Sequence, residues 1–487
     1  MSFSSVLFLV FFLPATLAAY WLLPRHRRVQ NGVLLAASTL FYFSWGPSAL
    51  LLFATTTLVN YGLLQRLRSR DAEGTPLHAR RLLPLALIYN LGQLFLLKYL
   101  GFFASSATAI SELLGSGAAV PELNWLVPIG LSFWTLQLCG HAIDVAYARR
   151  APPQSLLDYA VFVAFFPQIL SGPIPRGDLL DQLGQPRQPQ AADFTQGAIA
   201  CLLGFVMKFL VAASLVALVD PVYAQPLAYK ASAHWLALYA YAMQIFCDFA
   251  GYSLMALGLG RFFGLRLIDN FRFPFSARNI SEFWKRWHVS LTQFLFDYIY
   301  TPLVTGRGWM RGRLATGLFI VLLVSGLWHG ATWMFVLWGG LHGLALVVAH
   351  RWDEYYRSQC RRDRRWVQWR KSRGYVLAGW VLTQGWFLLS LIPFRSPDLG
   401  VAADFIAGLF GSGTEAIDFG TIAARLNTLL CLLFVPLYHL SATARGQRLL
   451  LWPTCPLVLR GVVYGMAVVY LFLFKPLSEG GFIYAQF

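Results

Sequence analysis

The chain has 487 residues, of which 57% are hydrophobic and only 13% are charged, and its formal net charge is +17. Soluble globular domains carry about 25% charged residues, so this composition excludes an ordinary soluble enzyme and indicates an integral membrane protein. A bilayer span needs about 20 mostly apolar residues. Stretches of this kind take up nearly the whole chain and leave no room for a large soluble domain.

The first apolar stretch, residues 3–23, has no positive residue before it and is followed by Arg25-His26-Arg27-Arg28. A cleaved secretory signal has the reverse order, so we interpret this stretch as a retained span with the N-terminus outside. The later loops alternate accordingly. The segments predicted to be cytoplasmic share an excess of Lys and Arg, and they are 66–81, 149–150 and 351–373. The net charge therefore suits anionic lipid headgroups and does not indicate a nucleic acid partner.

Apolar stretches predict membrane helices at residues 3–23, 32–46, 48–65, 82–104, 124–147, 195–219, 234–259, 313–328, 331–349, 374–394, 421–440 and 458–475. Two further segments, 156–174 and 283–304, are apolar but interrupted by Pro or charge, which predicts dipping or broken helices. Such backbone is tolerated at membrane depth only where protein or a water-filled cavity covers it. We therefore expect an all-α, polytopic helical bundle around a central funnel, as a single domain over residues 1–487.

The cysteines form no CxxC pair, and we interpret them as small buried hydrophobes that imply neither a disulfide framework nor a metal site. They are Cys139, Cys201, Cys247, Cys360, Cys431 and Cys455.

Ionisable side chains at membrane depth are costly, by about 2.5 to 3.5 kcal/mol on insertion scales, so each one is a candidate functional residue. Those that fall in or beside apolar stretches are Asp144, Lys208, Asp248, His288 and His329. The two histidines carry the strongest signal.

His329 lies between two apolar runs and has Gly326 and Gly330 close by. These glycines remove side-chain bulk, so another molecule or a backbone can approach the ring. The alternative is a packing histidine that hydrogen-bonds a neighbouring carbonyl.

His288 follows a cluster in which Lys285 and Arg286 stand between Trp284 and Trp287. Such a cluster suits a membrane interface and phosphate groups. The alternative is an interfacial anchor that faces lipid headgroups.

An imidazole has an unperturbed pKa near 6.5, so it can take a proton from a hydroxyl at neutral pH and return it. The sequence lacks the GxSxG, GxxxxGK[ST] and HExxH motifs of competing chemistries. General-base chemistry on an alcohol is the resulting prediction.

Two stretches around these histidines, FWKRWHVSLTQFLFDYIYTPL (283–303) and GLWHGATWMFVLWGGLHG (326–343), resemble the membrane-bound O-acyltransferases. The resemblance is strongest to the bacterial branch that O-acetylates exported polysaccharides such as alginate. Further stretches resemble the same branch in the same order, and they are FSSVLFLVFFLP (3–14), VPIGLSFWTLQ (127–137), FFPQILSGPIPR (165–176), QIFCDFAGYSLMALGLG (244–260) and FIYAQF (482–487).

The resemblance implies about eleven membrane helices in a bacterial inner membrane and an acetyl group moved from a cytoplasmic thioester, acetyl-CoA, with no bound cofactor. It also implies periplasmic or membrane-anchored SGNH-type acetyltransferases as partners, within the machinery that exports a polysaccharide such as alginate or cellulose. His329 matches the principal catalytic histidine and His288 the second one. Lys285, Arg286 and Trp287 become candidates for donor binding.

Asp248, Asp297 and Tyr298 become candidates for polar support of the same site. The chain also departs from its relatives, which often have an acidic residue at the position of Leu254 and a basic one at that of Phe296. A charge pair at these positions is therefore in doubt.

Two alternatives remain open. One is the transfer of D-alanine or another acyl group from a carrier protein to a cell-envelope polymer. The other is a proton-coupled transporter, which could also use buried His and Asp residues, although the chain shows no inverted repeat.

Overall fold

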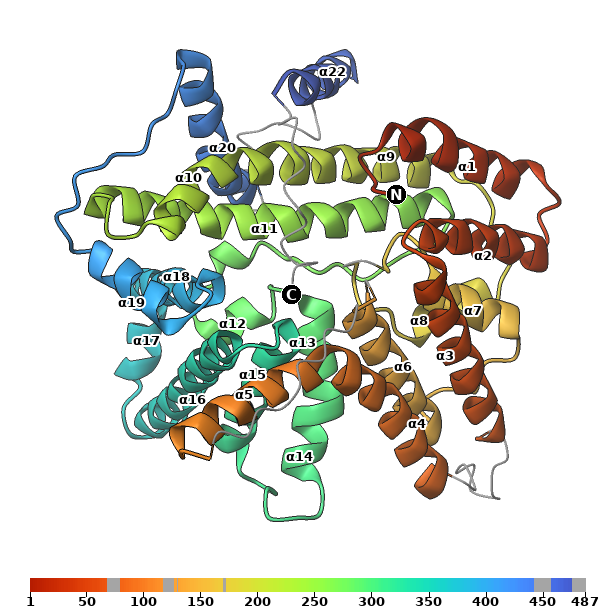
Figure 1. Ribbon diagram of the computed structural model, residues 1–487, viewed down its shortest axis with the longest axis horizontal. Helices are drawn as coiled ribbons and strands as arrows, with labels where there is room; N and C mark the ends of the chain where they lie inside the picture. The colour runs from red at the N-terminus through yellow and green to blue at the C-terminus, as the bar shows by residue number, and fades with distance from the viewer. Residues whose placement is uncertain (68–78, 117–126, 129, 170–171, 442–456, 475–487) are drawn as a thin grey trace. The chain divides into compact units, whose positions relative to one another are not determined.

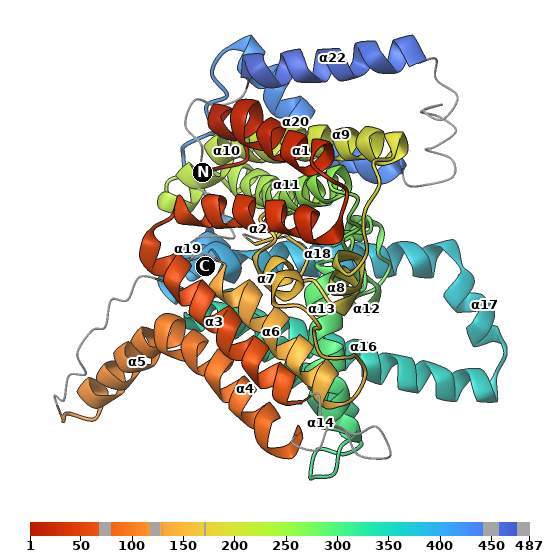
Figure 2. The ribbon, with the colours of Figure 1, turned by 90° about the vertical axis from the view of Figure 1, so that its right-hand side faces the viewer.

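The computed structural model describes residues 1–67, 79–116, 127–128, 130–169, 172–441 and 457–474. These residues are almost entirely helical (Figures 1 and 2). Within them, two isolated β-bridges join Tyr229 to Glu415 and Lys230 to Ser412. The predicted all-α class is confirmed. The matching stretch 482–487, Cys455 and most of the basic segment 66–81 lie outside the described residues.

The chain forms two compact units, which are described separately. One unit comprises Met1–Cys201 with Ser253–Ile268, and the other comprises Leu202–Tyr252 with Asp269–Phe487. Two of the boundaries fall inside helices, α9 (Ala191–Phe205) and α11 (Ala231–Phe262), and the third lies between Ile268 and Asp269, in the loop after α11. The single domain expected from the sequence stays a prediction.

The first unit contains, besides its parts of α9 and α11, the helices η1 (Leu7–Phe12), α1 (Leu13–Leu22), α2 (Arg27–Phe43), α3 (Pro47–Arg66), α4 (Ala79–Leu94), η2 (Phe95–Tyr99), α5 (Leu100–Leu113), α6 (Leu131–Ala146), α7 (Leu156–Ala164) and α8 (Gly177–Leu183). A buried arginine, Arg187, ties several of them together. It donates hydrogen bonds to the Tyr20 hydroxyl at 2.6 Å and to Asn31 Oδ1 at 2.5 Å. Burial of this charge is tolerated because its donors are satisfied.

The second unit contains, besides its parts of α9 and α11, the helices η3 (Val206–Ala212), α10 (Ala213–Ala224), η4 (Pro274–Ser276), α12 (Ile280–Trp284), α13 (Val289–Leu295), η5 (Phe296–Tyr300), α14 (Thr301–Thr305), α15 (Leu314–His329), α16 (Trp333–Arg362), α17 (Arg365–Lys371), α18 (Arg373–Arg395), α19 (Leu399–Gly408), α20 (Ile422–Ser441) and α22 (Leu457–Phe474). Both histidines of interest lie in this unit. The segment 283–304, expected to be broken, is interrupted at residues 285–288, after α12; from Val289 to Thr305 the stretches α13, η5 and α14 follow one another without a break.

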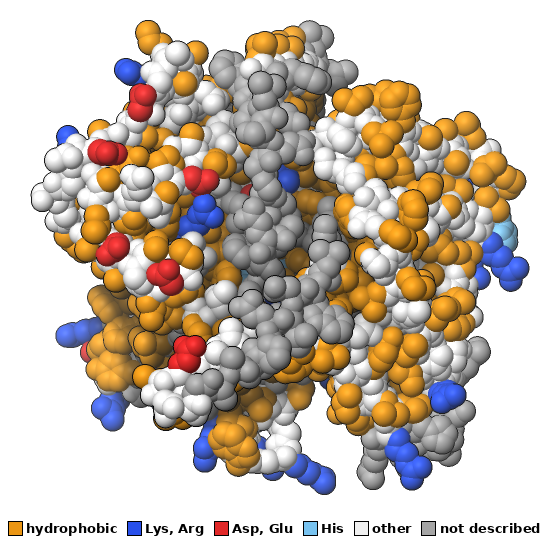
Figure 3. All heavy atoms as spheres, in the orientation of Figure 1, with side chains coloured by type: hydrophobic (Ala, Val, Ile, Leu, Met, Phe, Trp, Pro, Cys, Tyr) orange, Lys and Arg blue, Asp and Glu red, His pale blue; other side chains and the backbone are white. Residues whose placement is uncertain are grey.

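Within the described residues, seven helical stretches are long and apolar enough to cross a membrane: Pro47–Arg66, Arg81–Leu113, Ala191–Ala224, Ala231–Phe262, Trp333–Arg362, Arg373–Arg395 and Ile422–Ser441. This supports a multi-pass membrane protein, and Figure 3 shows hydrophobic side chains over much of the visible face. Several predicted spans form shorter helices. The 16 residues of α15, for example, rise about 24 Å, less than the roughly 30 Å of a bilayer core.

Helices α15 and α16 pack against each other through glycines. A Cβ on Gly326 would overlap the carbonyl oxygen of Phe335, and a Cβ on Gly339 would overlap that of Leu322. The two backbones can approach this closely only because both positions lack a side chain. The contact lies one turn before His329 at the end of α15, so it fixes where that imidazole sits.

We expect Gly339→Ala to force α15 and α16 apart and to lower stability by about 1–3 kcal/mol, as overpacking does. Thermal unfolding of the purified protein in detergent measures this as a lower Tm. Gly340→Ala is the matched control, because its Cβ would meet only Leu323 Cδ2, at 3.6 Å. Equal Tm values for the two variants would contradict the glycine contact.

Candidate active site around two buried histidines

His329 is the last residue of α15 and is 4% exposed. The helix ends there because the backbone of Gly330 is extended. Aromatic rings from three helices surround the imidazole. The ring centroids of Trp328, Trp338 and Phe394 lie 5.1, 5.0 and 5.6 Å from that of His329. The ring is thus held in an almost dry aromatic cage.

His288 precedes α13 and is 1% exposed. Its ring lies 4.6 Å from that of Phe249 and 5.7 Å from that of Trp328. Trp328 also contacts His329, so one indole touches both imidazoles. The structure therefore brings together the two histidines that the sequence singled out, although 40 residues separate them in the chain.

The backbone of His288 is left-handed, with φ 46° and ψ 53°. This conformation costs a non-glycine residue roughly 1–2 kcal/mol and is often found at functional sites. The fully buried Asn270, which lies earlier in the chain, holds this turn through hydrogen bonds. Asn270 O accepts from Val289 N at 3.0 Å, and Asn270 Oδ1 accepts from Ser290 N at 3.2 Å.

His288 lies outside the seven candidate spans of the described residues. Desolvation by burial lowers the pKa of its ring to about 3, so the imidazole is neutral at physiological pH. A neutral ring of this kind is a weak base and a good hydrogen-bonding group. It is better suited to orienting a hydroxyl than to removing its proton.

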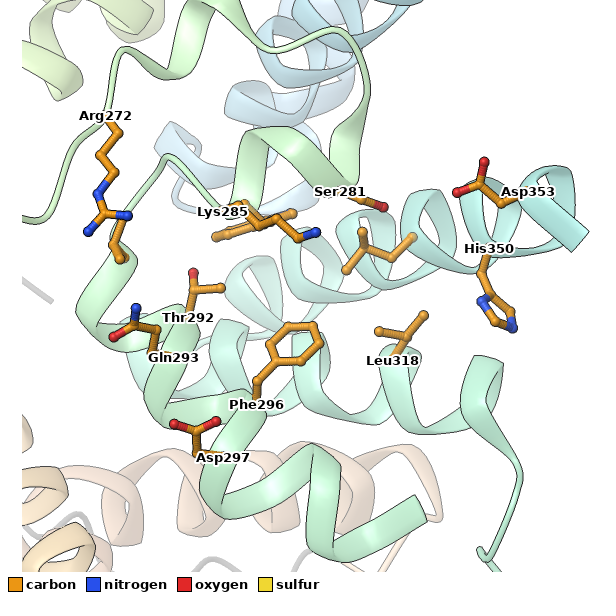
Figure 4. A pocket seen from close by; sticks show the side chains of 13 residues that line it. Arg272, Ser281, Lys285, Thr292, Gln293, Phe296, Asp297, Leu318, His350 and Asp353 are labelled. Atoms are coloured by element: carbon orange, nitrogen blue, oxygen red, sulfur yellow. The ribbon is translucent and has the colours of Figure 1, made fainter. Parts of the chain in front are cut away.

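A pocket of about 480 Å³ opens beside the histidine segment (Figure 4). Its lining combines charged and polar groups with apolar ones: Arg272, Ser281, Trp284, Lys285, Val289, Thr292, Gln293, Phe296, Asp297, Leu318, Leu346, His350 and Asp353. Figure 4 shows Lys285 between Arg272 at one end and His350 with Asp353 at the other. Neither Arg272 nor Lys285 forms an ion pair with any described residue.

The three candidates for donor binding occupy different surroundings. Lys285 lines the pocket, whereas the Arg286 guanidinium binds Glu282 at 2.7 Å and Ser276 Oγ at 3.0 Å. Trp287 is 4% exposed and stacks on the ring of Phe283 at 5.6 Å. Arg286 and Trp287 thus hold the segment together. The binding roles of all three stay predictions.

The other polar candidates are spread over both units. Asp248 pairs with Lys208 inside the second unit, and Asp297 lines the pocket. Tyr298 packs on Phe294 with ring centroids 4.8 Å apart. Asp144, in the first unit, lies 3.5 Å from Arg149.

Sequence reasoning missed Arg272 and Asn270. Both belong to the loop between α11 and η4, well before the histidine motif, and no local pattern marks them. Within the described residues, no group of three or more His, Cys, Asp or Glu side chains could hold a metal ion. The arrangement instead offers two buried imidazoles and a nearby pocket in which Arg272 and Lys285 stand with Asp297 and Asp353. Imidazoles suit proton transfer, and the two cations could bind a substrate that carries phosphate.

Comparison with known proteins gives evidence on function that does not depend on the geometry of the site. Residues 122–392 match the membrane-bound O-acyltransferase family. The chain is 36% identical, over 85% of its length, to the probable alginate O-acetylase AlgI of Azotobacter vinelandii, of which the match covers 79%. It is 28% identical, over 84% of its length, to the peptidoglycan O-acetyltransferase of Helicobacter pylori, of which 80% is covered. A teichoic acid D-alanyltransferase of Bacillus subtilis is 27% identical over 56% of this chain, with 71% of that protein covered.

We expect Asn270→Ala to leave the buried Ser290 N–H unpaired, at a cost of about 1–3 kcal/mol, and to loosen the turn that presents His288. The unfolding temperature and the rate of acyl transfer should both fall. Asn279→Ala is the control. It removes the α12 N-cap bond to Glu282 N, 2.8 Å long, without touching the His288 turn. If the two variants lose acyl transfer to the same extent, the Asn270 hydrogen bonds do not position His288 for the reaction.

Proposed function

The chain belongs to the membrane-bound O-acyltransferase family and is an O-acyltransferase, and on that basis we propose that it moves an acetyl group from cytoplasmic acetyl-CoA towards hydroxyls of an exported polysaccharide. Alginate and cellulose are the first candidates for this polysaccharide. The observation that carries this proposal is that one indole, Trp328, contacts two buried imidazoles beside a pocket lined by Arg272 and Lys285.

The position of the pocket supports a cytoplasmic donor. Helix α16 ends at Arg362, within the basic segment 351–373 that the distribution of charge places in the cytoplasm. His350 and Asp353, near that end of α16, line the pocket. Arg272 and Lys285 can then bind the phosphates of a nucleotide thioester, because charge-assisted hydrogen bonds to phosphate are strong and short.

In the proposed reaction, His329 removes the proton of the acceptor hydroxyl as its oxygen attacks the thioester carbonyl. The new C–O bond forms, the C–S bond breaks, and the proton passes from His329 to the departing thiolate. His288 orients the hydroxyl through its neutral ring. The aromatic cage excludes water, which would otherwise hydrolyse the thioester.

We propose that periplasmic or membrane-anchored SGNH-type acetyltransferases receive the acetyl group and pass it to the polymer. We propose a bacterial inner membrane as the location of the chain.

Transfer of an acyl group from a carrier protein is the second candidate, and the similarity to a teichoic acid D-alanyltransferase supports it. That match covers less of the chain at lower identity than the match to the alginate O-acetylase. Acetyl transfer from CoA is therefore the first choice. Membership of an acyltransferase family gives no support to the transporter alternative.

We expect His329→Ala to lower acetyl transfer by about 10²–10⁴-fold, the usual contribution of a general base. His288→Ala should cost less. Purified protein in lipid nanodiscs with radiolabelled acetyl-CoA and the candidate partner measures both. His439→Gln, a buried histidine on α20 bound to Val435 O at 2.9 Å, is the control. Full activity of His329→Ala would contradict the assignment of His329 as the general base.

Lys285→Ala and Arg272→Ala should each raise the KM for acetyl-CoA about tenfold with a smaller change in kcat, because each removes a charge-assisted bond to phosphate. Steady-state kinetics at constant ionic strength checks this. Lys371→Ala removes an equal charge from the exposed surface of α17 and should leave the KM unchanged. A KM that is the same in all three variants would argue against phosphate binding in this pocket.

A further inference from the structure

A second pocket lies within the first unit, between helices α2, α3 and α7, which pack against one another (Figures 1 and 2). Its volume is about 530 Å³, and most of its lining is apolar. Two lining residues, Leu58 and Leu156, are 55% and 40% exposed, so the pocket is a groove that opens to the surroundings. Because α3 is one of the candidate membrane spans, those surroundings are lipid.

Two of the hydroxyls that line the groove are already engaged within the protein. Ser38 Oγ accepts from Phe166 N at 3.2 Å, and Thr57 Oγ1 donates to Phe53 O at 2.8 Å. Neither hydroxyl therefore needs a polar group from an occupant to satisfy it. A hydrocarbon chain, which offers apolar surface along its whole length, suits such a lining.

A cation lies on the same side of α2 as the groove. Arg28 precedes the lining residue Leu35 by seven positions, so the two share one face of the helix and lie about 10 Å apart along its axis. Gly32 adds no bulk between them, since a Cβ there would meet no atom within 4 Å. Arg28 is exposed and forms no ion pair with any residue that the structure describes. Its neighbour Arg27, in contrast, lies 3.7 Å from Asp158.

The position of Arg28 suits the headgroup of a phospholipid in the cytoplasmic leaflet. The distribution of charge places the start of α2 in the cytoplasm, where the membrane surface is anionic. From Arg28 to Tyr42, which lines the far part of the groove, α2 rises about 21 Å. The acyl chains of one leaflet fill about 15 Å, half of the bilayer core. A lipid with its phosphate at Arg28 can therefore extend a chain past Leu35 and into the groove.

We propose that the groove between α2, α3 and α7 binds one acyl chain of an anionic phospholipid, whose phosphate is held by Arg28. The guanidinium supplies a charge-assisted hydrogen bond to the phosphate. The chain fills space in which the lining side chains would otherwise lack contacts, so the lipid stabilises the packing of these three helices. This site shares no residue with the proposed acyl transfer.

The phosphate contact is tested on the full-length protein, stripped of lipid in an uncharged detergent. Native mass spectrometry gives the Kd for phosphatidylglycerol and for phosphatidylcholine with the same acyl chains. We expect one phosphatidylglycerol to bind about fivefold more tightly, the contribution of one cationic side chain near a membrane surface. Arg28→Gln should abolish this preference. Arg361→Gln, which removes an exposed charge from the end of α16, is the control and should keep it.

The groove itself is tested by filling it. Ala54→Phe places a ring in the groove and should weaken binding of both lipids about tenfold, because the chain loses apolar contacts. Ala36→Phe is the matched control, since Ala36 is exposed on α2 and does not line the groove. In wild type, which needs no substitution, a phosphatidylglycerol with a photoreactive diazirine in its acyl chain should label peptides of α2, α3 and α7.

Three results would overturn the inference. A preference for phosphatidylglycerol that is absent in wild type, or that survives in Arg28→Gln, would exclude the phosphate contact. Equal lipid binding by Ala54→Phe and Ala36→Phe, or labelling spread over all exposed helices, would exclude the groove as the binding site. A wild-type protein that is dimeric in detergent while Ala54→Phe is monomeric would assign the groove to a second copy of the chain.

Discussion

The close approach of α15 and α16 is the constraint on which the site depends. Gly326 and Gly339 let the two backbones touch, and one turn later α15 ends at His329. The same approach brings Trp338 of α16 against the imidazole. A bulkier residue at either glycine would separate His329 from the aromatic rings that bury it. In a membrane, where apolar surface gains little from leaving lipid, such close packing of small residues is a main source of helix association.

Electrostatics explains how titratable groups persist in so apolar a setting. Lys208 pairs with Asp248, and the Arg187 guanidinium donates to the neutral oxygens of Tyr20 and Asn31. The candidate catalytic residues are imidazoles, which need no counter-ion while they are neutral. Arg272 and Lys285, which form no ion pair within the described part of the chain, line the pocket, where a phosphate could supply the missing charge.

Much of this could be predicted from the sequence, because hydropathy and motif are local properties. The helical membrane class, the broken segment 283–304 and both histidines emerged in this way. Within the described residues several predicted spans form helices shorter than a bilayer core, since apolar composition does not fix helix length. The sequence could not distinguish the surroundings of neighbours such as Lys285 and Arg286. In the structure the turn after α12 directs Lys285 to the pocket and Arg286 to Glu282. Asn270 and Arg272 meet the histidine segment through contacts between segments distant in sequence, which no local pattern records.

The break in the helical chain between α12 and α13 has a consequence for local stability. The glycine contact joins α15 and α16 closely, whereas α12 has five residues and is separated by residues 285–288 from a helical stretch that runs without interruption from Val289 to Thr305. A short helix has few internal hydrogen bonds to break, so we expect α12 and the turn after it to open locally at lower free energy than the long packed helices. The two imidazoles therefore differ in their support: His329 ends a packed helix, and His288 lies in a turn that Asn270 holds from another part of the chain.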